Sequence, residues 1–267
     1  MASNPIVRRP IAMRLLPARL RAWFYHRHFA RRHSDYLPLF DRAPLRRMPH
    51  LSMYDLRPGD VISGHIAFDG EYESDFTTRL LAHAREGGLL VDVGANMGYF
   101  SLLWAGTRAD NRVVALEASP AVVAMLTANV ERNGLSDRVR ILAKAASDSA
   151  GIVRFATGPS DQTGWGGIAP ADAAGIDVPA IRIDAELADE TIAVLKIDVE
   201  GAELWVVRGC EALLRERRIR HIFFEHNATR TKELDIADDG VVTYLESMGY
   251  RCRPLDAEQN DWHAEPA

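Results

Sequence analysis

The chain has 267 residues and a mass of 29.7 kDa, enough for one large domain with a substantial core. Hydrophobic residues make up 47% and charged residues 26%, which excludes wholesale disorder. No apolar run approaches the roughly eighteen residues of a membrane span. The two cysteines, Cys210 and Cys252, form no CxxC pair, which excludes a zinc ribbon and indicates a reducing compartment. We therefore expect a cytoplasmic protein.

The net charge of −5 is unevenly distributed. Residues 1–50 contain eleven arginines, no lysine and two acids, a local charge of +9, so the remainder carries −14. An acidic body with a basic arm argues against nucleic acid as a partner. Residues 11–33 mix apolar side chains and arginines at helical spacing, and Pro17 should start or kink a helix there. Two interpretations stay open: a helix that contacts an anionic membrane or an acidic carrier, and a helix packed on the body with solvated arginines.

The rest of the chain divides into three segments. Residues 51–88 should hold a small hairpin around 61–70, broken at Gly64 and Gly70, and a helix at about 74–86. Residues 89–256 form the main domain, and 257–267 a C-terminal tail. In the main domain, apolar strands alternate with helices, which predicts an α/β fold with a mostly parallel, doubly wound sheet. Strands are expected at 89–93, 113–116, 139–142, 152–155, 178–183, 192–197, 219–224 and 250–255, with helices at 99–105, 120–133, 203–215 and 241–248.

The first strand of this domain ends in Asp92-Val93-Gly94-Ala95-Asn96-Met97-Gly98. Ligands in doubly wound sheets lie beyond the carboxyl ends of the strands, so this loop is a binding site by position. Gly94 and Gly98 permit a sharp turn and close approach of the backbone to a ligand. The dinucleotide fingerprint requires glycine where Asn96 stands. A carboxylate at Asp92 would suit the cationic amino acid group and sulfonium of S-adenosylmethionine, and would repel a pyrophosphate.

Glu117 follows the second strand, where an acid can accept hydrogen bonds from both ribose hydroxyls. Loop and acid together predict an adenosine cofactor. A nicotinamide oxidoreductase is disfavoured by Asp92 and Asn96.

At this point the chain resembles the FkbM family of S-adenosylmethionine-dependent methyltransferases, from about residue 60 to 255. The resemblance lies in residues 91–100 (VDVGANMGYF), 115–120 (ALEASP), 195–203 (LKIDVEGAE) and 223–227 (FFEHN), with an upstream Gly-Glu-Tyr-Glu at 70–73. Ala118 and Ser119 depart from the Pro-Asn common after the ribose acid, which should affect loop stiffness. The resemblance implies a Rossmann-like fold and methyl transfer, usually to a hydroxyl of a sugar, glycan or polyketide-type metabolite. It also implies cofactor contacts from Glu73, Asp92, Gly94, Asn96, Gly98, Glu117, Ala118, Ala146 and Asp148, although Asp148 reads equally well as a helix cap.

Several acids stand at the ends of later strands. Asp198 is placed to orient or deprotonate an acceptor alcohol, and Glu225 and His226 end the next strand. His226 reads equally as an ordinary strand-end residue, and Glu200 as either an acceptor contact or a first-turn acid. Asp198, Glu225 and Asn227 could hold magnesium, but nothing in the sequence requires a metal.

The acceptor side is less defined. Residues 157–175 form a glycine-rich loop around Trp165, which we interpret either as a lid that contacts the acceptor or as a surface loop. Tyr72 is a further acceptor contact by resemblance. The favoured function is an O-methyltransferase of a sugar, glycan or glycosylated metabolite in glycan or natural-product biosynthesis. N-methylation of a small metabolite and a non-catalytic cofactor-binding scaffold in glycan assembly are the alternatives.

Overall fold

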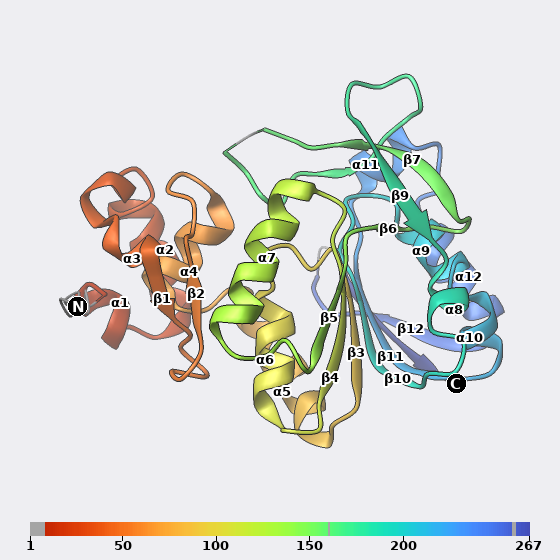
Figure 1. Cartoon of the computed structure of the whole chain (residues 1–267), viewed down its shortest axis with the longest axis horizontal. Helices are drawn as coiled ribbons and strands as arrows, with labels where there is room; N and C mark the ends of the chain where they lie inside the picture. Colours follow the sequence, from red (N-terminus) through yellow and green to blue (C-terminus); the bar gives the residue numbers. More distant parts are fainter. Residues whose placement is uncertain (1–8, 160, 258–259) are drawn as a thin grey trace.

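A seven-stranded sheet organises the larger part of the molecule, in the order β12-β13-β11-β10-β3-β4-β5 (Figure 1). The structure is a computed structural model that describes residues 9–159, 161–257 and 260–267. Five neighbouring strands are parallel, and β13 runs antiparallel between β11 and β12. The predicted α/β, mostly parallel sheet is thereby confirmed. The strands are β3 (Leu89–Val93), β4 (Arg112–Leu116), β5 (Val139–Leu142), β10 (Ile192–Ile197), β11 (Ile219–Glu225), β12 (Tyr250–Pro254) and β13 (Asp261–Pro266).

Helices cover both faces of the sheet (Figure 1). One apolar core joins Leu90, Val113 and Val194 to the side of α5, α6 and α7, and the other joins Leu89, Val91 and Val93 to the opposite helices. This division follows from the strand repeat of two, which sends successive side chains to opposite faces. The helices of the first face are α5 (Ser74–Glu86), α6 (Tyr99–Thr107) and α7 (Pro120–Arg132); those of the second include α8 (Ile183–Glu186), α9 (Glu203–Arg208), α10 (Glu211–Arg215) and α12 (Gly240–Ser247).

A smaller four-stranded sheet, β6-β9-β7-β8, lies beyond the carboxyl ends of the main strands. It is formed by β6 (Ala145–Ala146), β7 (Gly151–Ala156), β8 (Gly167–Ile168) and β9 (Ile176–Ile181). The loop expected at 157–175 is part of this sheet, because β8 pairs with β7 within it. A short helix, α11 (Ala228–Glu233), follows β11.

Three expected elements are wrong. The hairpin around 61–70 is instead helix α4 (Val61–Asp69), which Asp60 caps by accepting from Ser63 N and which Gly70 ends at a φ of 76°. The helix at 203–215 divides into α9 and α10, because the Gly209 carbonyl accepts from Asp184 N. The tail at 257–267 contains β13, which enters the sheet beside β11. Its alternating Trp262 and Ala264 were the local signal.

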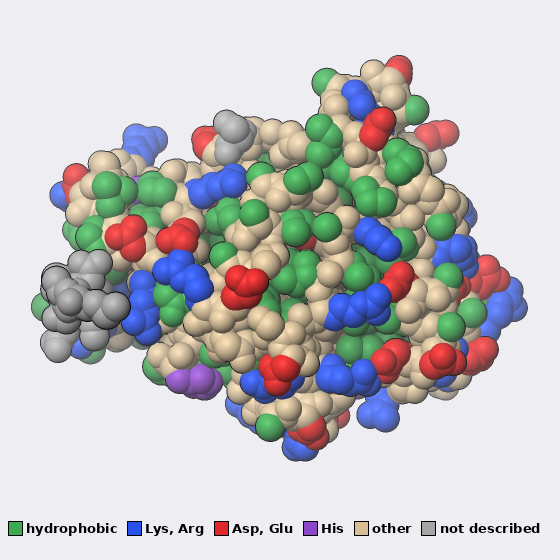
Figure 2. Space-filling view, viewed as in Figure 1, with side chains coloured by type: hydrophobic (Ala, Val, Ile, Leu, Met, Phe, Trp, Pro, Cys, Tyr) green, Lys and Arg blue, Asp and Glu red, His purple; other side chains and the backbone are tan. Residues whose placement is uncertain are grey.

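The N-terminal residues form a separate small unit beside α7, at the left of the molecule (Figure 1; Figure 2 from the same side). It contains α1 (Ile11–Leu15), α2 (Ala18–His28), a 3₁₀ turn (His33–Tyr36), α3 (Pro38–Asp41), the paired strands β1 (Arg42–Pro44) and β2 (Ser52–Tyr54), and α4. Met13, Tyr25 and Phe29 are buried in the first core, so the helices pack on the body. Arg21 is also buried and pairs with Asp69 and Glu71. The interpretation of a packed helix expected its arginines to be solvated, and Arg21 is an exception. Among the described residues, no helix is long and apolar enough to cross a membrane.

Candidate active site

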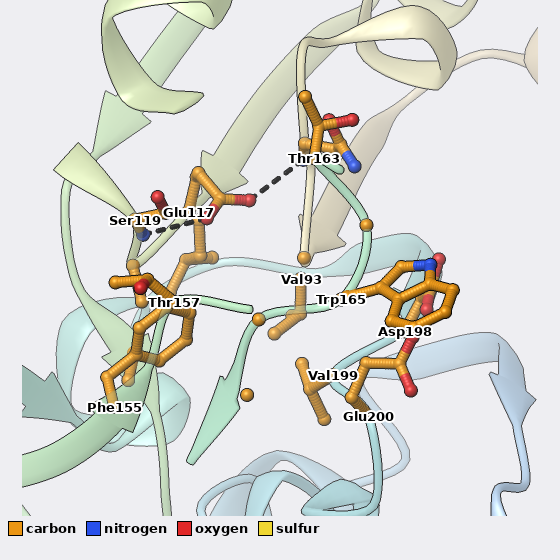
Figure 3. A pocket seen from close by; sticks show the side chains of 18 of the residues that line it. Val93, Glu117, Ser119, Phe155, Thr157, Thr163, Trp165, Asp198, Val199 and Glu200 are labelled. Atoms are coloured by element: carbon orange, nitrogen blue, oxygen red, sulfur yellow. Dashed lines mark hydrogen bonds between the residues drawn. The ribbon is translucent and has the colours of Figure 1, made fainter. Parts of the chain in front are cut away.

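A cavity of about 320 Å³ lies at the carboxyl ends of β3, β4, β10 and β11. The topology rule for doubly wound sheets places ligands at this edge, and the volume is in the range of small-molecule sites. Figure 3 shows Glu117 at one end of this space and Asp198 with Glu200 at the other. The residues predicted from sequence that line it are Tyr72, Gly94, Asn96, Glu117, Ala118, Ala146, Trp165, Asp198, Glu200 and Glu225.

The loop after β3 is held in a left-handed conformation. Gly94, Asn96 and Gly98 have φ values of 75°, 49° and 92°, which glycine adopts freely and asparagine tolerates better than most residues. A Cβ on Gly94 would lie 1.8 Å from the carbonyl oxygen of Asp198, so glycine is required for the two strand ends to approach. A Cβ on Gly98 would meet Leu126 instead. Gly98 therefore serves the packing of α7 and does not line the cavity.

Glu117 is fixed by the backbone around it. Its carboxylate accepts from Asn96 N at 3.0 Å and from Ser119 N at 2.8 Å, and the residue is 8% exposed. Burial raises the pKa of Glu117 to about 7, against the opposing effect of these hydrogen bonds. The result is a rigid, buried carboxyl group on the wall of the cavity, where it can accept hydrogen bonds from a diol.

Asp92 lies elsewhere than predicted. Its side chain is fully buried on the face of the sheet that carries Leu90, and it accepts from Ser101 Oγ of α6 at 2.6 Å. Lys196 Nζ on the neighbouring strand lies 3.8 Å away. Strand alternation explains the error, because Val93, one residue on, faces the cavity and Asp92 must point to the opposite side. Asp92 therefore supports Lys196 and α6 and does not line the cavity.

Asp198 and Glu225 stand side by side at the ends of β10 and β11 and line this cavity and a second one. Lys196 Nζ donates to Asp198 at 3.0 Å and so fixes its orientation. Glu225 is reached by solvent on one side. Loss of hydration on the cavity side, together with the negative charges of Asp198 and Glu73, raises the pKa of Glu225 to about 8.

The second cavity, of about 120 Å³, lies next to α5 and β13. Glu73 lines it and does not line the first cavity, where it was expected to contact a cofactor. Burial and the charge of Asp198 raise the pKa of Glu73 to about 7. Phe76, Phe223 and Trp262 give this cavity aromatic walls. The two cavities thus meet at the carboxylates of Asp198 and Glu225.

Three further predicted residues line neither cavity. His226 bonds Asp238 through Nε2 at 2.9 Å, and its backbone N–H donates to Asn260. The carbonyl of Asp148 accepts from Arg182, and the Asp148 side chain does not line either cavity. Asn227 accepts from Arg230 N as the cap of α11 and donates to Glu200 at 2.9 Å. Because the Asn227 amide is used in this way, the arrangement gives no support to a magnesium site formed with Asp198 and Glu225.

The start of α4 forms a wall of the first cavity that the sequence did not predict. Asp60, Val61 and Ile62 line the first cavity together with Gln162 and Thr163 of the loop opposite. Gln162 Oε1 accepts from Val61 N, and its amide group donates to Gly59 O. The local signal is Asp60 itself, because an aspartate directly before an apolar stretch is a typical helix N-cap.

The chain is similar to several known proteins. The family described as Methyltransferase FkbM domain matches residues 92–252. Methyltransferase sdnD of Sordaria araneosa is 28% identical over 175 residues, which cover 52% of this chain and 68% of that protein. The crystal structure of methyltransferase FkbM from Methylobacillus flagellatus KT matches at 15% identity with a TM-score of 0.48, over 76% of this chain and 52% of that one. This chain therefore spans about half the length of that structure. The SAH-bound methyltransferase PaMTH1 of Podospora anserina matches at 14% identity with a TM-score of 0.44, over 74% of this chain and 80% of that one.

The family match covers more than half of the chain, and it includes both the loop after β3 and the strand ends that form the cavities. The chain belongs to the FkbM family of S-adenosylmethionine-dependent methyltransferases.

Proposed function

We propose that this protein transfers a methyl group from S-adenosylmethionine to a hydroxyl group of a sugar, glycan or glycosylated polyketide-type metabolite. The observation that supports a hydroxyl acceptor is the pair of carboxylates, Asp198 and Glu225, at the junction of the two cavities. An alcohol is a poor nucleophile until its proton is removed, and a carboxylate within reach can accept that proton.

The residues of the first cavity fit the cofactor. A ribose diol needs an oriented hydrogen-bond acceptor. Glu117 can provide it, because its buried carboxyl group is fixed by two backbone N–H groups. Gly94, Ala118 and Ala146 leave room beside it. In this arrangement Glu117 would hold the ribose, and the loop at Gly94–Asn96 would hold the methionine end. The bound cofactor supplies a methyl carbon activated by its sulfonium.

The acceptor side then lies between the cavities. Asp198, oriented by Lys196, can hold the acceptor hydroxyl in line with the methyl group. The pKa of Glu225 is raised to about 8. A general base is most effective when its pKa lies near the pH at which the enzyme works, so Glu225 is suited to accept the proton. With S-adenosylmethionine held by Glu117 and the loop at Gly94–Asn96, the cofactor would donate its methyl group to the acceptor oxygen and leave as S-adenosylhomocysteine, and Glu225 would accept the hydroxyl proton. Trp165 and Tyr72 line the same space and are the proposed acceptor contacts.

The test compares Asp198→Asn and Glu225→Gln with wild type, using labelled cofactor and a panel of sugars and amines. We expect kcat to fall by about 10²–10⁴-fold in each variant, with cofactor affinity within a few-fold of wild type. Glu246→Gln, which removes an exposed carboxylate from α12, is the matched control and should leave turnover unchanged. Full turnover in both site variants would contradict the roles of these carboxylates. Turnover with amines alone would replace the hydroxyl acceptor by N-methylation, and cofactor binding without any turnover would support a scaffold.

A further inference from the structure

The first two helices expose large apolar side chains to solvent. On α1, Ile11 and Leu15 are 70% and 76% exposed, and on α2, Leu20 and Trp23 are 52% and 62% exposed. Residues three or four apart lie on the same side of a helix, so each pair forms one stripe. The opposite side of α2 carries Tyr25, and Phe29 follows at the end of the helix; both are buried against Phe68 of α4. The exposed stripes are thus not needed to hold these helices in place.

Unpaired cations accompany these stripes. Arg14, Arg27 and Arg31 are exposed, and none forms an ion pair with any side chain that the structure describes. They differ in this from Arg21 and Arg46, which both pair with Asp69 of α4. Asp35 is the first acid in the sequence, and its carboxylate pairs with Arg32.

We propose that this surface, formed by the apolar Ile11, Leu15, Leu20 and Trp23 and the unpaired Arg14, Arg27 and Arg31, docks on an anionic lipid bilayer. An interfacial helix needs apolar side chains that enter the boundary of the acyl chains and cations that meet the phosphates above them. The stripes and the unpaired arginines supply both, and tryptophan is favoured at that depth. An acidic protein surface would pair with the arginines, but it would not by itself cover four large apolar side chains. The proposal does not depend on the identity of the methyl acceptor.

The experiment measures co-sedimentation of the full chain with vesicles of phosphatidylglycerol and phosphatidylcholine, and with vesicles of phosphatidylcholine alone. Leu15→Ser with Trp23→Ser removes apolar contact, and Arg14→Gln with Arg27→Gln and Arg31→Gln removes charge. We expect the charge variant to lower partition into anionic vesicles by about a hundredfold, and the apolar variant by at least about tenfold. Partition of the wild type should fall as salt rises through the physiological range.

Matched controls place the same changes elsewhere. The apolar control combines Ile152→Ser and Ile176→Ser on the small sheet, where these side chains are 68% and 36% exposed. The charge control removes three exposed cations by Arg85→Gln, Arg220→Gln and Lys232→Gln. Both controls should partition as wild type does. Equal loss in the controls, equal binding to uncharged vesicles, or no binding of wild type to anionic vesicles at low salt would each overturn the proposal. The last result would favour an acidic protein, such as a carrier, as the partner.

Discussion

Asp60 and Thr163, 103 residues apart in the chain, are joined by two hydrogen bonds: the Asp60 carboxylate accepts from Thr163 N at 2.8 Å and from Thr163 Oγ1 at 3.1 Å. Asp60 is fully buried and also caps α4. The loop that carries Trp165 is therefore fastened to the N-terminal unit, which lies outside the segment that defines the family. One wall of the cavity thus depends on a part of the chain that the family match does not include.

Replacing Asp60 by alanine should loosen this loop. The change removes a helix cap and leaves the buried Thr163 N–H without an acceptor, so we expect a loss of about 3 kcal/mol in the free energy of unfolding. We also expect the Michaelis constant for the acceptor to rise about tenfold, because the loop lines the cavity. Urea unfolding and steady-state kinetics measure the two effects.

Thr163→Val is the milder test, since it removes the hydroxyl and keeps the backbone hydrogen bond. Thr243→Val is its matched control, because the Thr243 hydroxyl contacts Asp239 on the exposed side of α12. If Thr163→Val and Thr243→Val have the same Michaelis constants, the hydroxyl of Thr163 has no part in holding the loop.

Glu117→Gln should weaken cofactor binding by about ten- to a hundredfold. In wild type, the backbone N–H groups of Asn96 and Ser119 each donate to one oxygen of the Glu117 carboxylate. In the glutamine variant an NH₂ group replaces one of these oxygens, so two donors would face each other and the cofactor would lose a charged acceptor. Because the pKa of Glu117 is about 7, its ionised form grows as pH rises, so wild-type affinity should increase through that range. Calorimetric titration with S-adenosylmethionine between pH 6 and 8 checks both expectations.

The pH-dependent part of the affinity should be smaller in Glu117→Gln than in wild type. Glu131→Gln, on the exposed side of α7, is the control and should behave as wild type. Parallel affinity curves for Glu117→Gln and wild type would show that another group titrates.

Arg21→Ala should destabilise the attachment of α2. The Arg21 guanidinium lies 2.5 Å from Asp69 and 3.2 Å from Glu71, with 9% of its side chain exposed. Removing one partner of a buried ion pair commonly costs about 3–5 kcal/mol, but Arg46 and Arg47 still pair with these acids. We therefore expect a loss of about 2–3 kcal/mol in the free energy of unfolding, measured in urea.

Arg32→Ala provides the comparison for Arg21. Its pair with Asp35 is exposed, so its loss should change stability by no more than about 0.5 kcal/mol. A similar small effect at Arg21 would mean that its ion pairs do not hold the helix.

A histidine cluster at the start of β11 should make stability pH-dependent. His221 Nδ1 lies 3.1 Å from His263 Nε2, and the His83 ring packs at a tilt against that of His221, with 4.1 Å between the ring centroids. Burial lowers the pKa of all three, that of His263 to about 4. Repulsion from His221 lowers the pKa of His83 and His263 further, and the charges of Arg220 and Arg253 lower that of His221. Between about 4 and the ordinary value of 6.5, the unfolded chain binds more protons than the folded one. This contribution to stability is therefore complete above 6.5 and is lost as pH falls toward 4.

Buried carboxyl groups with raised pKa values make stability fall as pH rises, which opposes the effect of the histidines. The prediction therefore concerns the difference between wild type and a histidine variant. The pH dependence of unfolding in His263→Gln, subtracted from that of wild type, should give a term that rises between pH 4 and 6.5. His50→Gln, an exposed histidine outside the cluster, should give no such term. A difference curve that is flat over this range would contradict the role of His263.

Local pattern was sufficient for the strands and loops that carry the family motif. The stretch Leu89–Val93 is apolar and ends in glycines, and Glu117 follows the next apolar run, so their places at strand ends could be read directly. The same kind of pattern fails for residues 61–69, where apolar and small residues predict a hairpin but the structure has helix α4. The two caps, Asp60 and Gly70, carry the helical signal there, and packing of Ile66 and Phe68 into the core stabilises it.

Which carboxylates share a cavity was decided by tertiary structure. The sequence by itself determined the alternating strands and helices, the family and hence the class of cofactor, because these depend on residues close together in the chain. Three features depend on the pairing of strands and the packing of distant segments. The Asp92 side chain is buried against α6, Asp198 and Glu225 lie next to each other, and Asp60 accepts a hydrogen bond from Thr163. Local propensity carries no information about such contacts, because their energy comes from neighbours that only the folded chain brings together.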